Sequence, residues 1–281
     1  DVSWQSPTGG GMADPGANGM VVRTALNTTT SRSITIKDGE GSITNADGVA
    51  GNPEIGIAFV SGGFFRFEAE FLNTNAVQSQ YIGSAVASGT NTTAPAAGVI
   101  TPNHPGVILI RSSTTANSGY VYITGTAARM EIGGGEVYNF NFRTPASFTN
   151  TTWRAGYHTA TNQTDATDGV YFELNGSGAI VGKTANNSTR TTSATITTLS
   201  DNTWYHGRIV VNDAKTEAVF TIFDDAGTSL GTQTITTNLP ASGRRVGTGL
   251  VATNSGTTAT DLINIDYMNS FTNKKLTRGA Y

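Results

Sequence analysis

The chain has 281 residues, of which 34 are glycine and 13% are charged, and its formal net charge at pH 7 is −3. This charge excludes the basic field that nucleic-acid binding needs. The absence of cysteine excludes disulfides, thiol nucleophiles and Cys-based zinc sites. Many Gly, Thr and Asn residues with few Lys, Glu and Leu residues favour turns and β-branched strands over helices, so we predict an all-β protein.

The N-terminal stretch, residues 1–19, is rich in Gly and Pro and is predicted to form a flexible arm. Its Trp4 either plugs a pocket on a neighbouring protein or lies partly exposed. The start at Asp1 shows neither the charged nor the apolar segment of a signal peptide. No apolar run approaches the roughly 20 residues of a membrane helix, so we expect no membrane insertion.

Residues 20–56 contain short strand-like runs between turn-forming residues, at 20–26, 31–37, 41–45 and 53–57. So short a segment holds too few apolar side chains for a core of its own. Packing three copies about an axis would bury these side chains, so we expect a homotrimeric β collar. The predicted oligomerisation residues are Val21, Val22, Leu26, Ile34, Ile36, Ile43, Val49 and Ile55.

Two stretches of this segment, VVRTALNTTTSRSIT at 21–35 and GSITNADGVAGNPEI at 41–55, resemble a module common in tail fibres and other appendages of bacteriophage virions. Residues 45–53 carry most of the resemblance. The charged stretch KDGE at 37–40 departs from the Thr-, Ala- and Gly-rich versions of the module. The resemblance implies a trimeric collar, a location in the virion, and an arm that contacts other virion proteins.

Residues 57–281 are predicted to form one antiparallel two-sheet β-sandwich of about twelve strands, because no helical pattern interrupts the strand-like runs. An amphipathic strand enters it, with Phe65 and Phe67 on one face and Glu68 and Glu70 on the other, before a loop-rich stretch at 74–105. The later strands are predicted at 107–111, 119–125, 128–132, 136–144, 153–158, 169–175, 179–183, 190–198, 229–236, 246–254 and 262–271.

The clearest hairpin lies at 202–224, where apolar and polar residues alternate on both sides of a short polar turn at 213–217. With a period of two, Trp204 and His206 share one face of the first strand and Tyr205 and Ile209 share the other. We therefore predict two adjacent antiparallel strands.

Four motifs in this order, DGVYFEL at 168–174, NTWYHGRIVVN at 202–212, VFTI at 219–222 and INIDY at 263–267, resemble the concanavalin-A-like lectin and glucanase jelly roll of phage virion proteins. HPGV at 104–107 and GGGEV at 133–137 match the same layout, and the resemblance covers about residues 64–271. It implies a jelly roll, a fold that serves lectins, hydrolases and inert structural proteins alike.

Glycoside hydrolysis needs two carboxylates roughly 5 to 10 Å apart, one of them protonated. The E-x-D-x-x-E strand motif of many glucanases is absent. Glu68 and Glu70 share one side of a strand, which favours a solvated face. Glu173 has Asp168 or Glu136 as possible partners, but glutamates on strands more often pair with arginines, here Arg143 or Arg154.

Nucleophilic hydrolysis has less support, because there is no G-x-S-x-G motif and the three histidines lie in unrelated contexts. His104 precedes a proline and is expected to be a satisfied loop histidine. Asp165 and Asp168 are weak candidates for calcium ligands, and turn formation is the commoner role of such residues. We therefore predict no catalytic residues, no cofactor and no metal.

Sugar recognition requires an exposed aromatic ring beside polar side chains. One strand and the loop after it bring such residues together, although a tryptophan on a strand, Trp153 included, is more often part of the core. The predicted ligand-binding residues are Trp153, Tyr157, His158, Asn162 and Asp165.

These observations together predict a phage fibre or decoration protein whose lectin-like jelly roll attaches to a host cell-surface polysaccharide. The first alternative is a polysaccharide-degrading enzyme on the same fold. The second is a purely structural capsid or tail decoration without a ligand.

Overall fold

The computed structural model describes residues 96–116, 118–123, 130–160, 164–258 and 260–272, together with the strands at 20–25, 28–32, 41–44, 54–57, 66–70 and 86–88. Side chains are described from residue 97 onward within these ranges, except in 118–123. The chain divides into two compact units, Asp1–Gly62 and Gly63–Tyr281, and each unit is considered by itself.

The first unit contains two antiparallel pairs of strands, in which β1 (Met20–Ala25) pairs with β2 (Thr28–Arg32) and β3 (Gly41–Thr44) pairs with β4 (Glu54–Ile57). The second strand begins three residues before the predicted run, inside a Thr-rich stretch that the sequence pattern assigned to a turn. Threonine is β-branched and suits a strand, so the composition of the stretch misled the prediction.

The predicted collar falls largely on residues whose side chains are not described. The N-terminal arm and the predicted oligomerisation residues Leu26, Ile34, Ile36 and Val49 lie outside the described residues. The other four, Val21, Val22, Ile43 and Ile55, lie in β1, β3 and β4, whose backbone alone is described. The homotrimer therefore stays a prediction.

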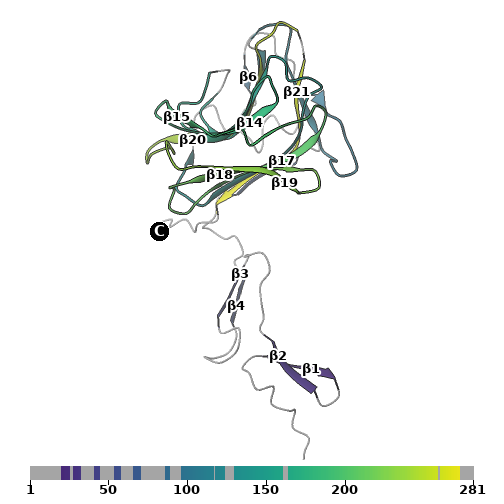
Figure 1. The fold of residues 1–281 in the computed structure, drawn as a ribbon, viewed down its shortest axis with the longest axis vertical. Helices are drawn as coiled ribbons and strands as arrows, with labels where there is room; N and C mark the ends of the chain where they lie inside the picture. The colour runs from purple at the N-terminus through teal and green to yellow at the C-terminus, as the bar shows by residue number, and fades with distance from the viewer. Residues whose placement is uncertain are drawn as a thin grey trace, which may run out of the picture. The chain divides into compact units, whose positions relative to one another are not determined.

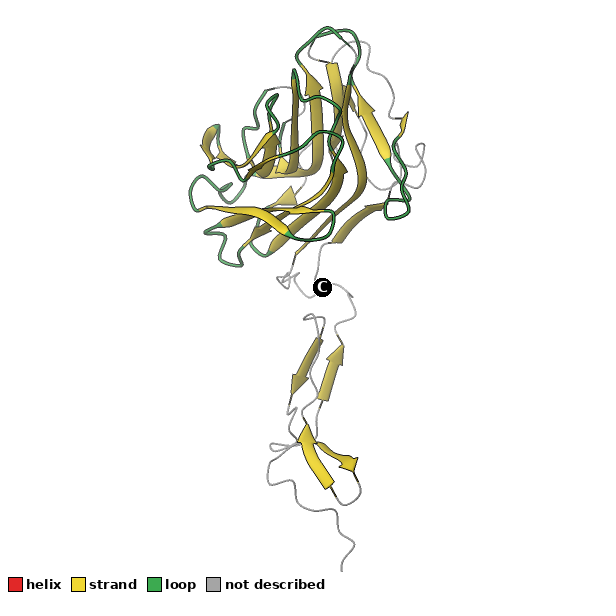
Figure 2. Cartoon of the chain, turned by 45° about the vertical axis from the view of Figure 1, so that its right-hand side comes forward, coloured by secondary structure: helices red, strands yellow, loops and turns green. Residues whose placement is uncertain are grey.

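The second unit is an antiparallel sandwich of two sheets that face one another (Figure 1, Figure 2). The β12 sheet has nine strands, of which seven follow one path: β15 (Thr189–Thr192), β14 (Ala179–Asn186), β13 (Gly169–Leu174), β12 (Thr151–His158), β20 (Arg245–Asn254), β9 (Ser118–Ile123) and β6 (Val86–Ser88). Off this path, β10 (Met130–Glu131) pairs with β20 and β16 (Thr197–Thr198) pairs with β14.

The β17 sheet has eight strands, of which seven follow one path: β19 (Ser229–Ile235), β18 (Ala218–Asp224), β17 (Trp204–Val211), β11 (Glu136–Arg143), β21 (Asp261–Thr272), β8 (Ile108–Arg111) and β7 (Ala96–Ala97). The eighth, β5 (Arg66–Glu70), pairs with β21. The predicted all-β sandwich is thus confirmed, and its predicted hairpin is β17 and β18. Two strands, β6 and β7, occupy the stretch that the sequence pattern assigned to loops.

The described residues form strands and loops, and no helix among them is long or apolar enough to cross a membrane.

The alternation predicted for the hairpin holds, because Tyr205, Ile209 and Val211 enter the core while His206 and Arg208 face outward. Glu68 and Glu70 lie on β5, whose side chains are not among those described.

Aromatic rings from both sheets meet in the core. Phe140 and Phe142 of β11 stack with ring centroids 4.6 Å apart, and Trp153 of β12 meets Phe142 edge-on at 5.1 Å. Phe172 of β13 in turn meets Phe220 of β18 at 5.5 Å. Offset and edge-on pairs add about 0.5 to 1.5 kcal/mol each to the effect of burial. The two inner faces therefore interlock through rings rather than through aliphatic side chains alone.

Two buried tyrosines also connect the sheets by hydrogen bonds. The Tyr138 hydroxyl of β11 donates to the carbonyl of Gly249 in β20 at 3.2 Å. The Tyr157 hydroxyl of β12 donates to the carbonyl of Val137 in β11 at 2.9 Å. Burial raises the pKa of both hydroxyls well above the ordinary range, so both remain donors.

Glycine is required where a core ring lies against the backbone of a strand. At Gly182 in β14, an added Cβ would come within 2.5 Å of the Phe220 ring. We expect Gly182→Ala to lower the free energy of unfolding by about 2 kcal/mol, because the ring has to leave its packed position. Urea denaturation followed by fluorescence measures this change.

The matched control is Gly133→Ala, since a Cβ there meets only the Glu136 carboxylate, at 3.8 Å. This substitution should change stability by less than about 0.5 kcal/mol. Equal effects of the two substitutions would contradict the packing at Gly182.

Candidate functional site

The structure does not form the predicted sugar site. Trp153 and Tyr157 are completely buried in the core, so neither ring is available to a sugar, and the prediction is wrong for both. His158 is also completely buried, and Asn162 lies outside the described residues. Of the four predicted residues that the structure describes, Asp165 is the one that stays partly exposed, on the outer face of the β12 sheet. Trp153 and Tyr157 point to the face of β12 that packs against the other sheet, because alternate residues of a strand point to opposite faces.

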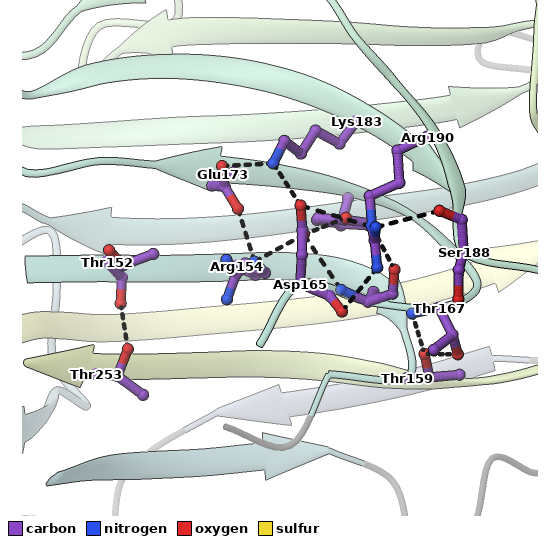
Figure 3. A network of polar contacts seen from close by, with 12 residues as sticks. Thr152, Arg154, Thr159, Asp165, Thr167, Glu173, Lys183, Ser188, Arg190 and Thr253 are labelled. Carbon is purple, nitrogen blue, oxygen red and sulfur yellow. Dashed lines mark hydrogen bonds and ion pairs between the residues drawn. The ribbon is translucent and has the colours of Figure 1, made fainter. Parts of the chain in front are cut away.

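A network of charged side chains occupies that outer face (Figure 3). The Arg154 Nε of β12 lies 2.7 Å from a Glu173 oxygen of β13 and 3.2 Å from Asp165. The Lys183 Nζ of β14 lies 2.7 Å from an oxygen of each carboxylate. The predicted pairing of Glu173 with Arg154 is thus confirmed. Two cations and two carboxylates alternate here, so that each charge is compensated.

The network fixes the loop that contains Asp165. The Tyr171 hydroxyl donates to Asp165 at 2.6 Å, and Arg190 donates to the carbonyls of Ala166 at 2.8 Å and Asp165 at 3.2 Å. Burial alone would raise the pKa of Asp165, but hydrogen bonds from Lys183 and Tyr171 and the charge of Arg154 outweigh it, so the net pKa is lowered. Beneath the loop lies a small apolar cluster of Ala160, Ala166, Tyr171, Ala185 and Val251.

This arrangement supports a structural role better than hydrolysis. A glycosidase needs a carboxylic acid that holds a proton, whereas Lys183 and Arg154 contact both Asp165 and Glu173 and the pKa of Asp165 is lowered. The other proposed partner, Glu136, belongs to the opposite sheet and accepts hydrogen bonds from the backbone of Gly133 and Gly134.

Calcium does not fit the two weak metal candidates. Asp165 already contacts cationic side chains, and Asp168 accepts a hydrogen bond from the Asn187 N–H at 2.8 Å and lies 3.6 Å from Arg244. Calcium prefers uncommitted oxygen ligands. Across the described part of the chain, no group of three or more His, Asp and Glu residues is arranged to hold a metal ion.

His158 lies under the same loop and is buried among backbone carbonyls, with its ring edge-on to Tyr171 at 5.7 Å. Burial, together with the charge of Arg154, lowers the pKa of His158 to about 3. The imidazole is therefore neutral at physiological pH and cannot supply a charge to a ligand.

An open depression of about 450 Å³ lies at one end of the outer face of the β17 sheet, within the usual size range of ligand pockets. Two turns form it, one before β17 and one after β18. Its lining residues are Asn202, Thr203, Trp204, Asp224, Asp225 and Ala226. For Asp224 and Asp225 the sequence pattern predicts turn formation alone.

Several polar atoms at this depression have unused hydrogen-bonding capacity. Asp224 accepts one hydrogen bond from the Thr228 N–H at 2.7 Å, and Asp225 contacts His104 at 3.0 Å, each through Oδ1. Within the described residues the second oxygen of each carboxylate and the Asn202 side chain make no hydrogen bond, and the buried Trp204 Nε1 has no partner. Trp204 is only 9% exposed and His104 covers one face of its ring, so the ring forms the base of the depression, and the free carboxylate and amide groups are what suit a polyhydroxylated ligand.

His104 contacts two residues that line the depression, Trp204 and Asp225. Its ring stacks on Trp204 with centroids 3.7 Å apart and an interplanar angle of 10°. Its two nitrogens contact Asp225 and Asp266. His104 is thus satisfied, as predicted, but its partners lie 121 and 162 residues away in the sequence. No local motif reveals such a contact.

Half-buried rings continue along the same face from the depression. Phe223, His206, Asn141 and Tyr267 are neighbours in register across four strands. The rings of His206 and Phe223 stack at 5.3 Å. Burial, together with the charge of Arg208, lowers the pKa of His206. This row is a surface of neutral rings and amides beside the depression.

The fold is thus an antiparallel β-sandwich of two sheets. The chain belongs to the SO2946-like family, because the family's C-terminal domain matches residues 103–266, more than half of the chain. Among proteins with curated descriptions, none matches the chain in sequence.

The fold is shared with one solved structure, and two others show a weaker likeness. A protein of unknown function, SO2946 from Shewanella oneidensis MR-1, is 22% identical with a TM-score of 0.63, covering 79% of this chain and 92% of its own. Peanut lectin is 12% identical with a TM-score of 0.45, covering 77% and 100%. A glycosidic hydrolase is 10% identical with a TM-score of 0.46, covering 75% and 97%. At these identities the likeness concerns the fold alone.

The charged network generates a prediction about stability. Glu173→Gln leaves Lys183 and Arg154 with one carboxylate fewer in a partly buried setting, so we expect a loss of about 2 kcal/mol in the free energy of unfolding. Amide exchange in residues 164–168 should also become faster, because the loop loses an anchor. Urea denaturation and hydrogen exchange measure the two effects.

Glu217→Gln, in the turn between β17 and β18, serves as the control and should change stability by less than about 0.5 kcal/mol. A Glu173→Gln protein as stable as this control would show that the network does not anchor the loop.

Proposed function

We propose that this protein binds a glycan at the depression beside Trp204. The observation that carries the proposal is that the second oxygens of Asp224 and Asp225 and the amide of Asn202 lie together over the largely buried ring of Trp204 in one open hollow. Sugar hydroxyls donate to carboxylates and bind amides, and the small exposed part of the Trp204 ring lines the base of the hollow. The lectin-like fold is compatible with this role but does not establish it.

The same residues suggest which sugars bind. The carboxylates of Asp224 and Asp225 accept hydrogen bonds and repel anions, so the site favours neutral or amino sugars over uronic and sialic acids. The row of Phe223, His206 and Tyr267 lies on the same face, where further sugar units of a chain would contact neutral rings.

We further propose that the glycan belongs to a bacterial cell surface and that the protein is part of a phage virion, as a fibre or decoration. The N-terminal resemblance to phage appendage modules supports this role, and so does the shortage of apolar residues in 20–56, which favours a homotrimer. In this proposal the N-terminal arm contacts other virion proteins.

Glycan binding is tested on an array of bacterial surface polysaccharides. We expect binding that falls at least tenfold in Asn202→Gly, which removes the amide yet tolerates the left-handed backbone at this position (φ 51°), and in Asp225→Asn. The control is Asp201→Asn, next to the depression but outside its lining. A silent array, or variants that bind as well as the control, would contradict the proposal.

Hydrolysis is the second candidate, favoured only by the closeness of Asp165 and Glu173, which share the Lys183 ammonium. New reducing ends released from the same polysaccharides, and lost in Glu173→Gln, would establish it. We expect none, because both carboxylates are paired with cations.

The proposed homotrimer is tested by multi-angle light scattering. The 281-residue chain, with a mass of 29.2 kDa, should elute with about three times that mass at micromolar concentration. A chain that lacks residues 1–56 should have the mass of one copy, because the predicted contacts are removed. A monomeric full chain would refute the collar.

A further inference from the structure

Arg143 of β11 is a half-buried cation that makes no hydrogen bond or ion pair with a described residue. A charged group that loses water without gaining a partner raises the free energy of the folded state. The other partly or fully buried cations of the described chain have partners: Arg154, Lys183 and Arg244 contact carboxylates, and Lys215 donates to the Ile132 carbonyl. The charge of Arg143 is therefore available to a partner from outside the chain.

Arg143 lies next to the depression. In strand register it is paired with Trp204 of β17 on one side and with Asn264 of β21 on the other. Phe142 lies in the core, so Arg143 points to the outer face, because successive residues of a strand alternate. Residues paired in register have their Cβ atoms about 5 Å apart on one face. Arg143 is therefore a direct neighbour of Trp204, the base of the depression.

Negative charge lies on the other side of the same ring. The turn after β18 brings Asp224 and Asp225 to the depression, each with one oxygen that has no partner among the described residues. Because β11 and β18 flank β17, the cation and the two carboxylates come from backbones roughly 10 Å apart. The third carboxylate nearby, Asp266, is buried against His104 and is closed to a ligand. The depression is thus positive on one side and negative on the other.

We propose that the depression binds a zwitterionic glycan, in which an amino sugar meets Asp224 and Asp225 and a nearby carboxylate meets Arg143. This inference rests on the proposed function and narrows it to one class of glycan. The planar guanidinium fork matches a carboxylate, and an ammonium donates to carboxylate oxygens. An anion alone is repelled by the two aspartates, and an ammonium alone leaves Arg143 unpaired. A glycan with both charges is neutral overall and compensates both sides of the depression.

The test compares four forms of one polymer by isothermal titration calorimetry with the 281-residue protein. The parent polymer alternates glucuronic acid and glucosamine, so each repeat carries a carboxylate and an ammonium. N-acetylation leaves the carboxylate alone, carboxyl reduction leaves the ammonium alone, and both changes together leave neither. We expect the parent to bind at least about tenfold more tightly than each of the others, because every change leaves a protein charge unpaired. Equal affinities for the four forms would overturn the proposal.

Substitutions assign the preference for the carboxylate to Arg143. The Arg143→Gln protein should bind the parent and the carboxyl-reduced polymer with affinities within about twofold of each other. Arg143→Lys retains the charge and should keep part of the preference, even if the glutamine variant folds poorly. The matched control is Arg208→Gln, because Arg208 is exposed on the same outer face and contacts no carboxylate among the described residues. Equal losses in Arg143→Gln and Arg208→Gln would refute the assignment.

The array of bacterial polysaccharides separates the failure of this inference from the failure of the proposed function. Binding restricted to polysaccharides that lack one of the two charges, lost in Asn202→Gly but kept in Arg143→Gln, would support glycan binding and overturn the zwitterionic preference. Silence of the array and of all four polymers would contradict both. Array binding that requires both charges and is lost in Arg143→Gln would support both.

Discussion

The structure depends on the interlocking of aromatic rings between two sheets. Phe140, Phe142 and Phe220 enter the core from one sheet, and Trp153 and Phe172 enter it from the other. Because large rings pack well only in offset or edge-on pairs, they determine how the sheets lie on each other. They also determine at which strand positions only glycine fits, as at Gly182 beside the Phe220 ring. The positions of the polar side chains on the two outer faces follow from this packing, because they lie on the same strands as the core rings.

The two outer faces use their polar residues differently. On the β12 sheet, Arg154, Glu173, Lys183 and Asp165 neutralise one another and fix a loop, so little capacity remains for a ligand. On the β17 sheet, the turns around Trp204 leave one oxygen each of Asp224 and Asp225, and the Asn202 amide, without a partner among the described residues. A satisfied network stabilises, whereas unsatisfied groups in a hollow are available for recognition. This contrast places the candidate site on the second sheet.

The clusters around His104 and Arg154 also illustrate why charge near a binding surface has to be considered as a set. Each carboxylate in the Arg154 network contacts at least two cations, whereas Asp225 and Asp266 share the single ring of His104. That one ring therefore connects the turn at the rim of the depression to strand β21.

The sequence by itself determined the fold class and the hairpin at 202–224 with its inner and outer faces, because period-two alternation is a local signal, and it favoured an arginine partner for Glu173 without choosing between Arg143 and Arg154. Only the tertiary structure decided that Trp153 and Tyr157 are core residues and that Asp225 meets His104. Burial depends on which face of a strand meets the other sheet. Contacts between residues more than a hundred positions apart arise from the order of strands, which local alternation does not specify.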